Sequence, residues 1–283
     1  MPYRITPGRL SIGNFSLYYE RAGSGPAVVF LHGLGGNHLS WWQQVPYFAR
    51  WFECVTLDQR SFGLSPDPDG TFNESHPGDL GALLDHLGVE KAVLVGQSMG
   101  GWTIAGYALE RPERVAAMVM ADTPGGILTP AMEALMARRA EGARLILDGE
   151  PPVGTMPTYA RDFFARRPEL AHLYDSLRIL GAHPPEDALL RIVSRRYPMD
   201  AVRARLTMPV LCLVGEQDAL IAPAMIRELA NFLPNARLAT VPDCGHSVYF
   251  EKPAVFNHIV LDFLREIGYA PAEASTPRQE LPG

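Results

Sequence analysis

Short apolar runs alternate with longer helix-like stretches along most of this chain, and this alternation limits the folds open to it. The runs lack the in–out alternation of a half-solvated sheet, so we expect strands buried on both faces. Strands separated by helices predict a mainly parallel sheet flanked by helices. Arg9–Glu20 alternates around Gly13-Asn14 and predicts an antiparallel hairpin at the sheet edge. The other predicted strands are Ala27–Leu31, Cys54–Leu57, Ala92–Val95, Met118–Met120, Val210–Val214 and Arg237–Val241.

Residues 124–207 interrupt this pattern. They show no convincing strand, contain the turns Pro151-Pro152 and Pro184-Pro185, and carry 12 Arg and no Lys against 10 Asp and Glu. We therefore expect a helical insertion at 124–207 within an α/β core formed by 1–123 and 208–269. The end of the chain, 270–283, is rich in Pro, Ala and Glu, and we expect it to be frayed.

The composition excludes several classes of partner. The net charge is −6 and there is no Lys/Arg block, so we expect no nucleic-acid partner. No apolar run approaches the ~20 residues of a membrane span, and Met1–Arg4 does not begin a signal peptide. The three cysteines, Cys54, Cys212 and Cys244, are too scattered to predict a disulfide framework or a zinc site. We expect a cytoplasmic protein.

One motif carries most of the chemistry. The strand-like run Val93–Val95 leads into Gly96-Gln97-Ser98-Met99-Gly100, and a helix-like stretch follows. A G-x-S-x-G sequence between a strand and a helix is typical of a sharp turn that projects a nucleophilic serine at a helix N-terminus. Ser98 is therefore the predicted nucleophile.

A serine hydroxyl needs a base, and the base needs an orienting acid. His246 follows the last predicted strand, where ligand-contacting groups of an open α/β sheet gather. Asp218 closes the preceding strand and completes the chain order Ser…Asp…His, so we favour it as the acid. Asp122, which also closes a strand, remains the alternative. The remaining histidines are expected in a turn (His32), near a pocket or the surface (His38), or on the surface: His76, His86, His172, His183 and His258.

Acyl transfer also requires two N–H donors for the oxyanion. We expect one from Met99, directly after the nucleophile, and the other from Leu34 in the glycine-rich loop Leu31–Gly36. That loop is not G-x-G-x-x-G and no Walker lysine follows it, so a nucleotide site is not expected.

These blocks together resemble the α/β-hydrolase superfamily, in its capped serine-hydrolase branch, over about residues 20–265. The resemblance rests on Phe30–Gly36, Asp58–Ser65, Gly96–Gly101, Gly215–Asp218 and Gly245-His246 followed by Phe250–Pro253. It departs from the usual D-x-R-G-x-G-x-S at Ser61-Phe62. It implies an eight-stranded, mostly parallel sheet, a helical cap at 124–207, and no cofactor.

The predicted function is hydrolysis of a small-molecule carboxylic ester or lactone through a Ser98 acyl-enzyme. Cleavage of a C–C bond in a vinylogous diketone is an alternative, although Ser247 stands where those hydrolases carry a tryptophan. A slow small-molecule receptor with an intact triad is another alternative. Candidate substrate contacts are Phe163, Phe164, Trp102 and Val248. The substrate itself and the oligomeric state stay open.

Overall fold

The computed structural model describes residues 4–137, 158–160, 162–271 and 274. Part of the predicted insertion, 138–157 and 161, lies outside these residues. So does the predicted frayed tail, apart from residues 270, 271 and 274. No helix in the described ranges is long and apolar enough to cross a membrane.

The described residues form one eight-stranded sheet in the order β1-β2-β4-β3-β5-β6-β7-β8. The first two strands form the predicted hairpin, and β2 also pairs antiparallel with β4, whereas all remaining pairs are parallel. The predicted α/β architecture with a mostly parallel sheet is confirmed. The strands are β1 Ile5–Ile12, β2 Phe15–Ala22, β3 Ala27–Leu31, β4 Glu53–Leu57, β5 Ala92–Gln97, β6 Val115–Ala121, β7 Val210–Gly215 and β8 Ala236–Val241.

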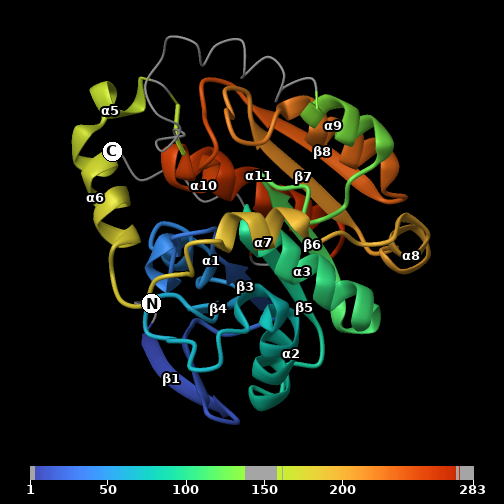
Figure 1. The fold of residues 1–283 in the computed structure, drawn as a ribbon. Coiled ribbons are helices and arrows are strands. Elements are labelled where there is room, and N and C mark those ends of the chain that lie inside the picture. Colours follow the sequence, from blue (N-terminus) through green and yellow to red (C-terminus); the bar gives the residue numbers. More distant parts are fainter. Residues whose placement is uncertain (1–3, 138–157, 161, 272–273, 275–283) are drawn as a thin grey trace.

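Helices cover both faces of the sheet (Figure 1). The segment between β6 and β7 is helical from residue 130 to residue 137 and again in α5–α8. The α-helices with described bounds are α1 Val45–Phe48, α2 His76–His86, α3 Met99–Glu110, α5 Phe163–Arg166, α6 Pro168–Arg178, α7 Ala188–Ser194, α8 Met199–Arg205, α9 Pro223–Phe232, α10 Val248–Glu251 and α11 Pro253–Glu266. The 3-10 helices with described bounds are η1 His38–Trp41, η2 Phe72–Glu74 and η3 Pro112–Arg114.

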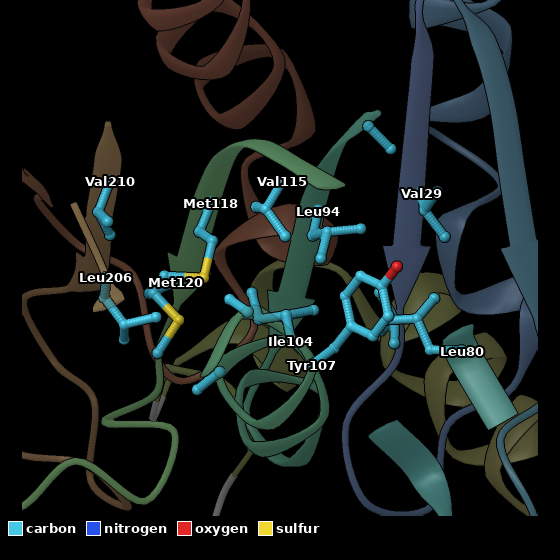
Figure 2. Close-up of a cluster of buried hydrophobic side chains, with 14 of the residues drawn as sticks. Val29, Leu80, Leu94, Ile104, Tyr107, Val115, Met118, Met120, Leu206 and Val210 are labelled. Carbon is cyan, nitrogen blue, oxygen red and sulfur yellow. The ribbon is translucent and has the colours of Figure 1, made fainter. Parts of the chain in front are cut away.

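Alternate residues of the central strands enter two separate cores. Val29 of β3 and Leu94 of β5 pack toward α2 and α3, whereas Val28 and Val93 pack toward α1 and α11. Figure 2 shows the first core, where Leu94 and Met118 from neighbouring strands approach the side chains of α3. Burial on both faces explains why these strands read as continuous apolar runs. The expectation fails for β8, whose residues are mostly half-buried because it is an edge strand.

The loop after β4 shows why glycine is usual at position 61. Ser61 has φ +75°, in the left-handed region that favours glycine, so a glycine there would avoid the backbone strain that Ser61 carries. Asp58 stabilises the same loop, because its buried carboxylate accepts N–H bonds from His38 (2.6 Å) and Leu64 (2.7 Å). The departure therefore affects a structural turn.

Candidate active site

Ser98 lies on the sharp turn between β5 and α3. Its φ of +47° and ψ of −116° are strained for a residue with a side chain. The turn is possible because its neighbours are small: a Cβ on Gly96 would lie 2.6 Å from the carbonyl oxygen of Gly100. The predicted strand–turn–helix context around Ser98 is therefore present.

The structure brings Ser98, His246 and Asp218 together. The Oγ of Ser98 lies 2.9 Å from Nε2 of His246, and Nδ1 of His246 lies 2.8 Å from Oδ2 of Asp218. Both His246 and Asp218 are buried. Because the carboxylate accepts from Nδ1–H, the neutral imidazole leaves Nε2 free to accept the hydroxyl proton of Ser98. This arrangement can activate a serine nucleophile.

Asp122, the alternative acid, has different partners. Its carboxyl group accepts from the backbone N–H of Gly215 at 3.0 Å and of Val248 at 3.4 Å. Burial and the nearby charge of Asp218 raise its pKa well above the ordinary value. Asp122 therefore links the end of β7 to the start of α10, two residues after His246, and it makes no hydrogen bond to the imidazole among the described residues.

The two expected oxyanion donors come from different elements. Met99 is the first residue of α3, and Leu34 lies in the loop after β3. Among the described residues, neither amide N–H donates a hydrogen bond to a protein acceptor. A Cβ on Gly33 would lie 3.1 Å from Cβ of Ser98, so this loop passes directly beside the nucleophile.

His32 stabilises the same loop, as its predicted turn role requires. Its Nδ1 donates to the carbonyl of Gly33 at 2.8 Å and its Nε2 accepts from the N–H of Gln59 at 3.0 Å. The bond from Gln59 needs the neutral ring, and burial lowers the pKa of His32 to about 4. Protonation would remove the acceptor for Gln59.

Two side chains that support the triad were not assigned a role from the sequence. Gln97 donates from Nε2 to the carbonyl of His246 at 2.9 Å. Glu251 accepts from the N–H of Gly245 at 3.0 Å and of Ser247 at 3.4 Å, the two residues that flank His246. Their positions within the G-x-S-x-G motif and the Phe250–Pro253 block are the only sequence signals that could have found them.

The four candidate substrate contacts differ in their exposure to solvent. Phe163 is 2% exposed and packs against Tyr159 and Phe250, whereas Phe164 is 59% exposed. Trp102 is buried in a cluster with Met99 and donates from its indole N–H to the carbonyl of Arg195 at 3.1 Å. The fourth candidate, Val248, is fully buried and follows His246 by two residues. Their contact with substrate stays a prediction.

The expectation that His76 lies on the surface is wrong. His76 is buried beside Phe72 and its Nε2 donates to the carbonyl of Arg60 at 3.1 Å, and burial lowers its pKa to about 3. His86, His172, His183 and His258 are exposed, as expected. Within the described part of the chain, no group of three or more His, Cys, Asp or Glu side chains is arranged to hold a metal ion.

A sequence model described as the alpha/beta hydrolase fold matches residues 26–253. The chain belongs to the α/β hydrolase fold family. The resemblance drawn from the sequence is therefore confirmed, as is the prediction of an enzyme of the α/β-hydrolase type. The confirmation concerns the family and leaves the substrate and the residue roles as proposals.

Relatives of this α/β hydrolase differ in chain length and in the reaction that their names describe. The bifunctional epoxide hydrolase 2 of Sus scrofa is 26% identical over 93% of this chain, which spans only 57% of that protein's length. A 2-hydroxy-6-oxo-6-phenylhexa-2,4-dienoate hydrolase of Comamonas testosteroni is 28% identical over 90% of this chain and 93% of its own.

Solved structures of similar fold include an esterase and a lactone-degrading enzyme. The thermophilic esterase of Thermogutta terrifontis has a TM-score of 0.74 and 27% identity, covering 93% of this chain and 99% of its own. Est816, described as an N-acyl homoserine lactone degrading enzyme, has a TM-score of 0.73 and 26% identity, covering 90% of this chain and 100% of its own.

Proposed function

We propose that this α/β hydrolase is a serine hydrolase that cleaves a small-molecule carboxylic ester or lactone through an acyl-enzyme on Ser98. The hydrogen-bonded chain from Ser98 through His246 to Asp218 carries this proposal. The likeness to an esterase and to a lactone-degrading enzyme supports the choice of bond.

The reaction follows from the positions of these groups. Ser98 Oγ attacks the substrate carbonyl while Nε2 of His246 takes its proton, and Asp218 stabilises the imidazolium that forms. The amides of Leu34 and Met99 stabilise the oxyanion of the tetrahedral intermediate. The imidazolium then protonates the leaving alcohol, and a water molecule activated by the same imidazole hydrolyses the ester on Ser98. This mechanism calls for no cofactor, nucleic acid or membrane.

Replacing Ser98 by Ala tests the proposal. The variant should fold normally and lose hydrolysis of 4-nitrophenyl esters by about 10⁴- to 10⁶-fold in kcat, because the acyl-enzyme cannot form. A fluorophosphonate should label the wild-type protein once, at Ser98, and should not label the variant. Intact-mass and peptide mass spectrometry measure the labelling, and circular dichroism checks the fold.

The substrate panel should contain esters of increasing chain length, lactones and a dienoate diketone. Substantial turnover by folded Ser98→Ala, or labelling at another residue, would exclude Ser98 as the nucleophile. Turnover of the diketone alone would favour the C–C bond hydrolase. Labelling of the wild-type protein without turnover of any compound would favour the receptor.

A further inference from the structure

Helix α6 is held by two hydrogen bonds to distant parts of the chain, one to the loop after β3 and one to the residue after His246. The buried side chain of Asn37 donates from Nδ2 to the carbonyl of Leu177 at 2.7 Å. The hydroxyl of Tyr174 lies 3.0 Å from Oγ of Ser247. Because the Ser247 hydroxyl donates its proton to the carbonyl of Thr158, the Tyr174 hydroxyl is the donor in this pair. The C-terminal end of α6 is therefore fixed beside the candidate active site.

Arg178, the last residue of α6, lies over the loop that carries the expected oxyanion donor. A Cβ on Gly35 would lie 3.0 Å from Nε and 3.4 Å from Nη2 of Arg178. Gly35 directly follows Leu34, so the guanidinium lies beside the residue next to the one whose amide we assign to the oxyanion. A side chain at position 35 would displace the arginine from this place.

A small cavity of about 10 Å³ lies between the end of α6 and the nucleophile's strand. Gln97, which precedes Ser98, lines it together with Leu34, Tyr174 and Tyr249. Among the described residues that line this cavity, Arg178 is the only one with a charged side chain. Its walls are otherwise aromatic or neutral, so no acidic group among these lining residues competes with an anion for the solvent-exposed guanidinium.

Arg178 has no acidic partner among the described residues, whereas Arg166, Arg167 and Arg191 have one. Arg166 pairs with Asp162 at 2.9 Å and Arg167 with Glu169 at 2.6 Å. The guanidinium carbon of Arg178 lies 5.9 Å from the centre of the Tyr174 ring. Its N–H donors make no hydrogen bond to a described protein acceptor, so they are available to a substrate.

We propose that Arg178 binds a carboxylate of the substrate, so that the preferred substrates are esters or lactones that carry a free carboxylate. This inference rests on the proposed function, because the carboxylate belongs to the ester or lactone that Ser98 would attack. The planar guanidinium can donate two parallel N–H bonds to a carboxylate, which provides both affinity and orientation.

The test compares an anionic ester with a neutral ester of similar length. 4-Nitrophenyl hydrogen adipate carries the carboxylate and 4-nitrophenyl hexanoate lacks it. Arg178→Gln should lower the ratio of their kcat/KM values, anionic over neutral, by about 10- to 100-fold, mainly through KM of the anionic ester. Arg178→Lys should restore part of the ratio. Arg166→Gln, which removes a paired and exposed cation, is the matched control and should leave the ratio unchanged.

An unchanged ratio in Arg178→Gln would overturn the inference. If thermal stability falls at the same time, the cation acts only on the C-terminal dipole of α6. A binding experiment separates this failure from failure of the proposed function. Calorimetry should detect binding of adipate to Ser98→Ala and at least 10-fold weaker binding when Arg178→Gln is added. Arginine-dependent binding of adipate without turnover of any ester would refute the proposed function and support the carboxylate site.

Discussion

Replacing Asp218 by Asn tests the triad through the partners of each carboxylate oxygen. Oδ2 of Asp218 accepts from Nδ1 of His246 at 2.8 Å, while Oδ1 accepts from the backbone N–H of Leu220 and of Ile221, both at 2.8 Å. An asparagine has one carbonyl oxygen, and two amide donors require it at the Oδ1 position. Its NH₂ group must then face His246 and donate to Nδ1.

This orientation forces the inactive tautomer of His246. With Nδ1 accepting, the ring proton moves to Nε2 and points at Ser98, so the imidazole can no longer take the hydroxyl proton. We expect kcat to fall by about 10⁴-fold, which corresponds to about 5.5 kcal/mol in the activation free energy. Initial rates on 4-nitrophenyl acetate measure the loss, and the melting temperature should change little because the side-chain shape is kept.

Asp122→Asn is the matched control. Its carbonyl oxygen can keep the bond from Gly215, and only the 3.4 Å contact with Val248 is lost. The raised pKa of Asp122 favours a neutral group already, so we expect a destabilisation of about 1 kcal/mol and a change in kcat below about 10-fold. A loss of several orders of magnitude in Asp122→Asn, with Asp218→Asn near wild type, would show that the triad runs through Asp122.

Two further predictions concern stability. Since the pKa of His32 falls from 6.5 to about 4 in the native state, the unfolded chain binds a proton first as the pH drops. The contribution of His32 to the free energy of unfolding should therefore fall by about 3 kcal/mol from pH 6.5 to pH 4, in addition to the fall that the lowered pKa of His76 causes. In urea titrations His32→Gln should remove this part of the pH dependence, and an unchanged slope would contradict it. Phe163→Ala should cost about 3–5 kcal/mol because the ring is buried, whereas exposed Phe164→Ala should cost under about 1 kcal/mol; equal losses would contradict this placement.

Local patterns predicted the sheet because its central strands are buried on both faces. Ala27–Leu31 was predicted with its observed bounds, and the hairpin turn at Gly13-Asn14 lies where alternation indicated it. The burial of the His76 side chain could not be predicted from a local pattern. It lies in a helix, and its burial depends on Phe62 and Phe72, which approach it only in the folded chain.

The candidate catalytic residues were predictable for a similar reason. Ser98, Asp218 and His246 each follow a strand, and the carboxyl ends of parallel strands meet at one edge of the sheet. The chain order favoured Asp218 over Asp122 but left Asp122 open, because β6 and β7 are neighbours and both acids lie at that edge. Only the directions of their hydrogen bonds distinguish them: one carboxylate faces the imidazole and the other faces two backbone amides.

Substrate specificity depends on contacts that no spacing in the sequence encodes. Arg178 is one of 12 arginines at 124–207, and nothing local separates it from those that pair with a neighbouring acid. Its position follows from two bonds that span 140 and 73 residues, Asn37 to Leu177 and Tyr174 to Ser247. The second bond also gives a reason for a small hydroxyl residue directly after His246. In this chain Ser247 accepts from α6, so the residue that departs from the C–C hydrolase pattern also helps to place the proposed carboxylate site.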